Sequence, residues 1–85
     1  MGELAHVVNI GKVLEEQLNE VEIYSVMELK EIGAKQAWLR IQTKDPSACL
    51  LRLQALEGAI EGVKKTALSQ EVKNDLKAFY QEHKR

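Results

Sequence analysis

Two glycines, each followed closely by a lysine, are the strongest candidates for chemistry in this sequence. Gly11 directly precedes Lys12, and Gly33 precedes Lys35 by two positions. The two Ile-Gly pairs lie 22 residues apart, and each separates a short apolar segment from an amphipathic stretch. In a helix–hairpin–helix motif, the backbone N–H groups of such a turn and of the following helix N-terminus hold a nucleic-acid phosphate. The candidate nucleic-acid contacts are Asn9, Gly11, Lys12, Gly33 and Lys35.

The charges around these turns favour weak DNA binding at most. The net charge is −1, and residues 1–43 carry 4 Lys/Arg against 7 Asp/Glu. A DNA-binding surface needs clustered basic side chains, because each neutralised phosphate contributes to affinity. DNA therefore remains a candidate partner of low affinity. The alternative interpretation is that both glycines only close turns.

No arrangement of residues predicts catalysis. His6 and His83 stand near opposite ends of the chain, without a Cys or carboxylate at a metal-ligand spacing. The single cysteine, Cys49, falls in the most apolar segment, which predicts a buried small side chain rather than a nucleophile. The glycine loops that bind nucleotide phosphates are missing. We expect no enzymatic activity, no metal, no cofactor and no small-molecule substrate.

The segment from Asp45 to Val63 is predicted to be the central helix. Asp45 can cap a helix N-terminus, and Pro46 suits the first helical position. Apolar residues cover most of the circumference, which is typical of a helix buried among others. Glu57 is the exception, and it either faces solvent or turns inward to accept backbone N–H bonds. Small residues at i,i+4 spacing predict close packing against a helix of the same chain or of a second copy: Ala55, Gly58, Ala59 and Gly62.

The rest of the chain predicts further helices and no strand. Asn9 is expected to cap a helix that presents Glu15 to solvent, and its apolar face is Ile10, Val13, Leu14, Leu18 and Val21. Ser25 and Glu28 form a capping box for a helix that ends at Gly33. A helix from Ala34 follows, and Ser69 caps the last one, whose inner face includes Leu76, Phe79 and Tyr80. The prediction is an all-α bundle of about five helices with helix–hairpin–helix character, in a single domain over residues 1–85.

Composition is that of a globular protein, with 45% hydrophobic and 29% charged residues. The single cysteine excludes an intramolecular disulfide and suits a reducing compartment. The sequence shows no signal peptide and no membrane-spanning stretch, so we expect a cytoplasmic protein without membrane contact.

Several stretches together resemble the C-terminal domain of the TfoX/Sxy family, bacterial regulators of competence for DNA transformation. They are NIGKVLEEQL, VMELKEIG, the segment AWLR from Ala37, and LLRLQALEGAIEGV. The resemblance covers about residues 4–76 and implies a small helical bundle of helix–hairpin–helix character. Lys12 replaces a proline and Glu22 a glycine that related sequences tend to have. From this departure we expect Glu22 not to adopt the left-handed conformation that a glycine would allow.

Two functions are compatible with these observations. The first is a non-catalytic regulatory module that binds another protein or a second copy of itself, favoured by the small size and near-neutral charge. The second is a nucleic-acid-binding domain that contacts phosphates through its glycine turns. Salt separates them, because phosphate binding weakens steeply as salt rises whereas apolar contacts respond little.

Overall fold

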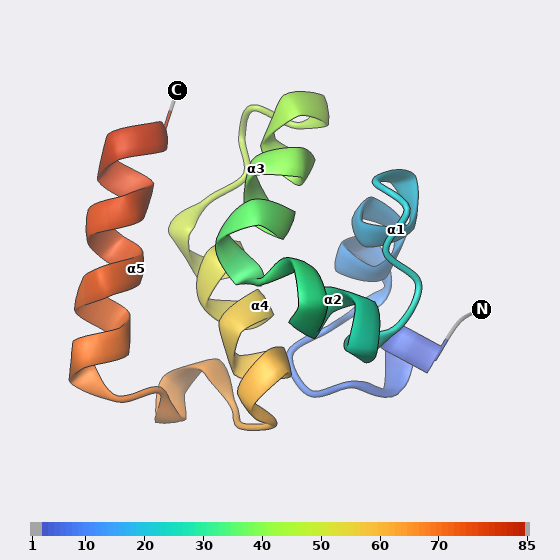
Figure 1. The fold of residues 1–85 in the computed structure, drawn as a ribbon, viewed down its shortest axis with the longest axis horizontal. Helices are drawn as coiled ribbons and strands as arrows, with labels where there is room; N and C mark the ends of the chain where they lie inside the picture. The colour runs from blue at the N-terminus through green and yellow to red at the C-terminus, as the bar shows by residue number, and fades with distance from the viewer. Residues whose placement is uncertain (1–2, 85) are drawn as a thin grey trace.

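The structure, a computed structural model, describes residues 3–84 and contains only helices and connections within that range (Figure 1). The α-helices are α1 (Lys12–Glu20), α2 (Val26–Ile32), α3 (Ala34–Lys44), α4 (Leu50–Glu61) and α5 (Gln70–His83). Short 3-10 helices, η1 (Glu3–His6) and η2 (Lys65–Ala67), precede α1 and α5. The predicted all-α class with about five helices is therefore confirmed. Helix–hairpin–helix character stays a prediction.

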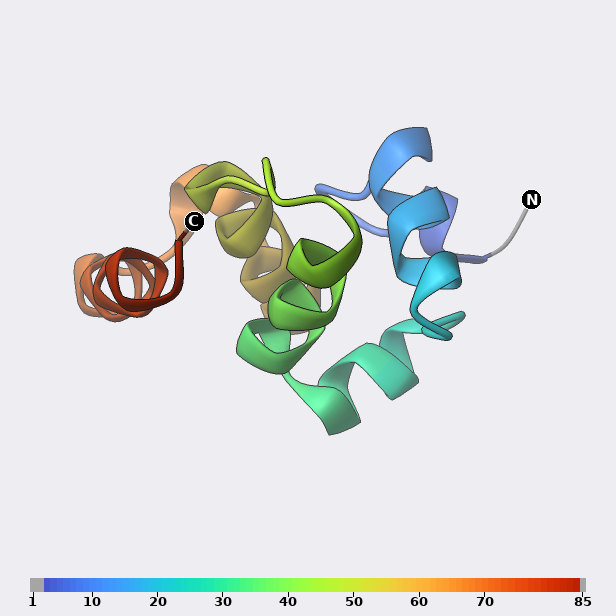
Figure 2. The same cartoon turned by 90° about the horizontal axis from the view of Figure 1, so that it is seen from above.

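The central helix is α4, which contacts α2, α3, α5 and η2. Seen from above, α1 and α5 lie on opposite sides of the α3–α4 pair (Figure 2). Three side chains of the α3–α4 pair are fully buried: Trp38 of α3, and Leu53 and Leu56 of α4. Burying a side chain of leucine size stabilises a fold by about 1.5–3 kcal/mol, so this pair forms the centre of the core.

Aromatic side chains hold α5 against α3. The ring of Trp38 meets those of Phe79 and Tyr80 edge-on, with centroid distances of 6.1 and 5.8 Å. Gln42, which is also buried, donates from Nε2 to the carbonyl of His83 at 2.7 Å. These contacts pack the half-buried aromatic residues of α5 against the core, on the face that their helical spacing predicts.

Serine caps start two helices as expected. The Ser25 hydroxyl accepts the backbone N–H of Glu28 at 3.1 Å, and the Ser69 hydroxyl accepts that of Val72 at 3.2 Å. The Glu28 carboxylate reaches back to the N–H of Tyr24, one residue before the predicted partner, at 2.9 Å. Each such cap stabilises its helix by about 1 kcal/mol.

The predicted start of the central helix at Asp45 is wrong. Helix α4 begins at Leu50, with the half-buried Cys49 at the N-cap. Asp45 instead accepts the backbone N–H of Ser47 at 3.1 Å, which closes a separate turn. Aspartate bonds its own local backbone as readily in turns as at helix starts, so the sequence pattern did not distinguish the two.

Helix α1 also differs from its prediction. Gly11, not Asn9, is its N-cap, and its buried face is Leu14, Glu15 and Leu18. Val13 is 63% exposed, because it precedes Leu14 and so lies about 100° away around the helix. Glu15 is buried rather than solvated.

Glu22 does adopt the left-handed conformation, with φ of 65°, contrary to the expectation from its sequence. The N–H of Ile23 donates to Leu18 and that of Glu22 to Asn19, at 2.9 and 3.0 Å. This pair of bonds is a Schellman motif, and both Leu18 and Ile23 are fully buried. The hydrogen bonds and burial together offset the cost of about 1–2 kcal/mol for a side chain in this conformation.

Candidate functional site

Asn9 connects the beginning of the chain to the end of α4. Its side-chain Nδ2 donates to the carbonyl of Val63 at 2.8 Å, and its Oδ1 accepts the N–H of Lys65 at 3.0 Å. The backbone of Asn9 is left-handed, with φ of 70°, a conformation that asparagine tolerates better than most residues. The side chain is therefore occupied by a structural bridge and does not cap α1.

Gly58 makes this bridge possible. A Cβ atom at Gly58 would overlap the Asn9 side chain and lie 2.8 Å from the Val63 carbonyl oxygen. The prediction for Gly58 was close packing against a helix, whereas the atoms nearest to it belong to the Asn9 side chain and the segment after α4. Gly62 has a different role, since it ends α4 in a left-handed conformation with no atom near its missing Cβ. Ala55 and Ala59 are buried.

The Asn9 bridge places the N-terminus of α1 beside α4 and leaves a groove of about 410 Å³ between them, hereafter the α1–α4 groove. Two large apolar side chains line it while remaining exposed: Val13 of α1 at 63% and Leu51 of α4 at 59%. The buried Leu14 and Ala55 also line it. The groove thus has an accessible apolar surface continuous with the core.

The charged side chains that line the α1–α4 groove, among the residues that the structure describes, are all positive. Lys12 and Lys65 line it and form no ion pair within the described part of the chain, and Arg52 lines it while bonding Asp45 at 2.6 Å. The side-chain hydrogen bond from Ser47, followed by that from Arg52, holds the pKa of Asp45 well below its usual range. Gly11, the N-cap of α1, makes no side-chain bond to the first N–H groups of the helix. No capping side chain therefore offsets the partial positive charge that these N–H groups carry.

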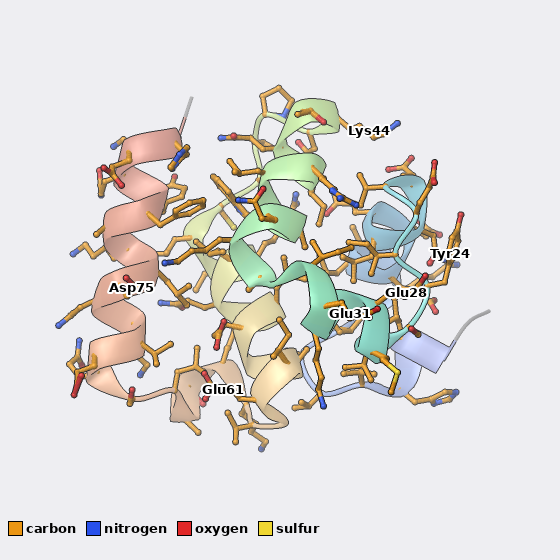
Figure 3. The ribbon with its side chains drawn as sticks, viewed as in Figure 1. Tyr24, Glu28, Glu31, Lys44, Glu61 and Asp75 are labelled. Carbon is orange, nitrogen blue, oxygen red and sulfur yellow. The ribbon has the colours of Figure 1, made fainter. Side chains whose placement is uncertain are left out.

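The second glycine turn faces a different pocket, of about 420 Å³, where α2 and α3 join and meet α4 and α5; we call it the Gly33 pocket. Lys35 lines it, and its Nζ lies 2.6 Å from the carboxylate of Asp75. Figure 3 labels Asp75 on α5. The same Nζ lies 5.4 Å from the ring centroid of Phe79. Lys35 therefore has a partner carboxylate within the chain, although the ion pair is exposed to solvent.

Glu57 is a feature of this pocket that the sequence interpretation missed. Its side chain hydrogen-bonds the carboxylate of Glu61, one turn along α4, and this bond and partial burial raise its pKa to about 7. Lys35 opposes the shift and Asp75 adds to it. Neither predicted orientation describes Glu57, which is half-buried and faces another carboxylate. The i,i+4 spacing of the two glutamates was the available signal.

The two sets of candidate nucleic-acid contacts are not brought together. Asn9, Gly11 and Lys12 line the α1–α4 groove, Gly33 and Lys35 line the Gly33 pocket, and no residue lines both. Within residues 3–84, no three metal-ligating side chains gather at one place. Over that same range, no helix combines the length and the apolar character needed to cross a membrane.

Comparisons with known proteins agree with the resemblance read from the sequence. The sequence model of the TfoX C-terminal domain matches residues 1–80. A triclinic crystal structure of an uncharacterised protein from Listeria monocytogenes is 42% identical, with a TM-score of 0.92 over 96% of this chain and 97% of that one. A tetragonal structure of a protein of unknown function from the same organism is 44% identical, also with a TM-score of 0.92, over 94% and 98%. No functionally curated protein gives a significant match.

Proposed function

The chain belongs to the TfoX C-terminal domain family, and on that premise we propose that it is a non-catalytic regulatory module that acts by binding another protein. Because that family comprises regulators of bacterial competence, the proposed setting is control of DNA transformation from the cytoplasm. A binding role fits the side chains around the α1–α4 groove and the Gly33 pocket, since neither of these two combines a nucleophile with a base in the pattern that catalysis requires.

The observation that carries this proposal is the α1–α4 groove. Leaving Val13 and Leu51 exposed in water costs about 25 cal/mol for each Å² of apolar surface, which a bound partner recovers. A groove with exposed apolar side chains and a charged margin is the usual anatomy of a protein-binding surface. The two side chains come from different helices, so only the folded chain presents them together.

Nucleic acid is the second candidate, and one observation favours it. Lys12, Lys65 and the N-terminus of α1 lie around one groove, an arrangement that could hold a single phosphate. The second predicted contact, Lys35, would have to exchange its exposed ion pair with Asp75 for the phosphate. Specific DNA affinity normally rests on many phosphate contacts, so DNA binding through this groove would be weak and strongly salt-dependent.

Site-specific crosslinking in cells tests the protein-binding proposal. A photoreactive aromatic residue replaces Val13 or Leu51 in the full chain, and Met27, which is 70% exposed on α2, is the matched control position. We expect one protein to be crosslinked from positions 13 and 51 and not from position 27. The crosslink from position 13 should disappear when Leu51→Asp is added.

Anisotropy of labelled duplex and branched DNA, from low to physiological salt, tests the alternative. Binding with a log–log salt slope of about −0.9 per phosphate, lost in Lys12→Glu, would establish the nucleic-acid role and displace the proposed one. Crosslinks that form equally from all three positions would show that the α1–α4 groove is not the binding surface.

A further inference from the structure

We propose that the α1–α4 groove binds an acidic amphipathic helix of the partner protein. This inference rests on the proposed function and adds the chemistry of the partner. Three properties of the groove carry it: the sign of its charge, its exposed apolar side chains, and the absence of a sheet edge in residues 3–84.

Charge selects an acidic segment. The whole chain carries −1, whereas the charged side chains among the described residues that line the groove are Lys12, Arg52 and Lys65, all positive. Arg52 bonds Asp45 through Nη1, so the positive groups without an ion pair to a described residue are the two lysines and the N-terminus of α1. Complementary charge of this kind raises the association rate and excludes partners of the wrong sign.

The exposed side chains select an amphipathic segment rather than a merely acidic one. Val13 stands on α1 and Leu51 on α4, and the buried Leu14 and Ala55 line the same groove. A ligand must therefore bring apolar groups to fill the space. A purely charged ligand would have to lose its own hydration against these two apolar side chains, which offer no hydrogen bonds in return. Nucleic-acid backbone is disfavoured for the same reason.

A helix is the conformation that this groove fits. Within residues 3–84 there is no strand to which an extended peptide could add its backbone hydrogen bonds. No aromatic side chain is among the described residues that line the groove, which disfavours the aromatic-lined type of site that binds polyproline segments. Of the recurring modes that use apolar anchors, the one that fits is an amphipathic helix with anchors at i, i+3 or i+4, and i+7.

Synthetic peptides and the full chain test the inference directly. The probe is a labelled amphipathic helix of about 16 residues, with leucines on one face and glutamates on the other. One control peptide has the glutamates replaced by lysines, and a second has the same composition in scrambled order. Binding is measured by fluorescence anisotropy at low and physiological salt.

Variants of the chain locate the site. We expect Leu51→Asp, Val13→Asp and the double variant Lys12→Glu/Lys65→Glu each to weaken binding of the acidic helix by about tenfold or more. Met27→Asp and the double variant Lys77→Glu/Lys84→Glu make matching chemical changes at exposed positions outside the groove and should leave the affinity unchanged. Circular dichroism of each variant shows that the fold is retained.

The outcomes separate this inference from the proposed function. Equal binding of the basic or scrambled peptide would overturn the inference, as would DNA binding that the groove variants abolish. Concentration-dependent dimerisation abolished by Leu51→Asp would also overturn it and assign the groove to a second copy. If crosslinking at positions 13 and 51 captures a basic or neutral segment, the inference fails while the protein-binding function stands. If those positions crosslink no protein, the proposed function fails first.

Discussion

Lys12 and Lys35 each follow a glycine at the start of a helix, yet the fold surrounds them differently. Lys12 lies in an open groove where the described lining residues include no carboxylate, beside the exposed side chain of Val13. Lys35 lies in a pocket where α5 supplies Asp75 at 2.6 Å and a phenyl ring at 5.4 Å. One lysine is available to a partner molecule, and the other is already held within the chain.

The difference shows that a glycine turn followed by lysine does not by itself make a binding site. What decides is the element packed opposite the turn. The Gly33 pocket meets α5, which carries Asp75, whereas the α1–α4 groove meets the first turn of α4, which carries Leu51 and Arg52. Both sites share α4 as a wall, so variants can disturb them together or one at a time.

The largest effect is expected from Leu56→Ala, which removes a fully buried side chain from α4. The free energy of unfolding should fall by about 2–5 kcal/mol, because the lost apolar contact leaves a cavity. Chemical denaturation measures it, and both sites should loosen together. Leu51→Ala on the same helix is the matched control, since it is 59% exposed and should change stability by less than about 0.5 kcal/mol. Similar values for the two variants would show that the core lies elsewhere.

Gly58→Ala should disturb the α1–α4 groove alone. The added Cβ would lie 2.8 Å from the Val63 carbonyl and overlap the Asn9 side chain, so the segment after α4 must move. We expect a loss of about 1–3 kcal/mol from this overpacking, with amide NMR shifts confined to the residues around Asn9 and Lys65. Gly11→Ala is the control, because nothing lies within 4 Å of its added Cβ. Shifts of equal size around Gly33 would mean that the two sites are coupled.

Glu57→Gln should change the pH dependence of stability through the Gly33 pocket. The pKa of Glu57 is raised from 4.5 to about 7, so the folded chain keeps a proton that the unfolded chain releases. The native protein should therefore lose stability as pH rises from 4.5 to about 7, and the glutamine variant should lose this slope. Denaturation at several pH values measures it, with Glu82→Gln as an exposed control that retains the slope. A slope unchanged in Glu57→Gln would contradict the carboxyl pairing with Glu61.

The smallest effect is expected from the lysines themselves. Lys35→Ala should lower stability by no more than about 1 kcal/mol, because its bond to Asp75 is solvent-exposed and screened. Lys12→Ala should be neutral, since Lys12 has no partner to lose among the described residues. Denaturation at low and high salt measures both, and the difference between them should shrink as salt rises. A larger loss for Lys12→Ala would reverse the comparison.

Local signals in the sequence predict much of the fold but only part of the candidate site. Ser25 and Ser69 start helices because their hydroxyls bond a backbone N–H three residues ahead, a contact independent of the rest of the chain. Asp45 failed as a predictor because the same chemistry also closes turns.

The groove illustrates what could not be foreseen. Asn9, Gly11 and Lys12 are neighbours in sequence, so their shared location follows at once. Leu51 and Lys65 join them only through the tertiary fold, including the Asn9 bridge, which no local pattern encodes. Glu57 and Glu61 lie between these cases, because their i,i+4 spacing was visible but the partial burial of Glu57 was not.

The Asn9 bridge also has a consequence for the order in which the chain folds. It joins residues 54 and 56 positions apart, whereas α3 and α4 are consecutive helices separated by a short turn. Closing a long loop costs more chain entropy than closing a short one, so we expect the α3–α4 pair to form early and the bridge late. The groove exists only after that last closure. A partner that binds there would recognise chains that have finished folding and ignore those that have not.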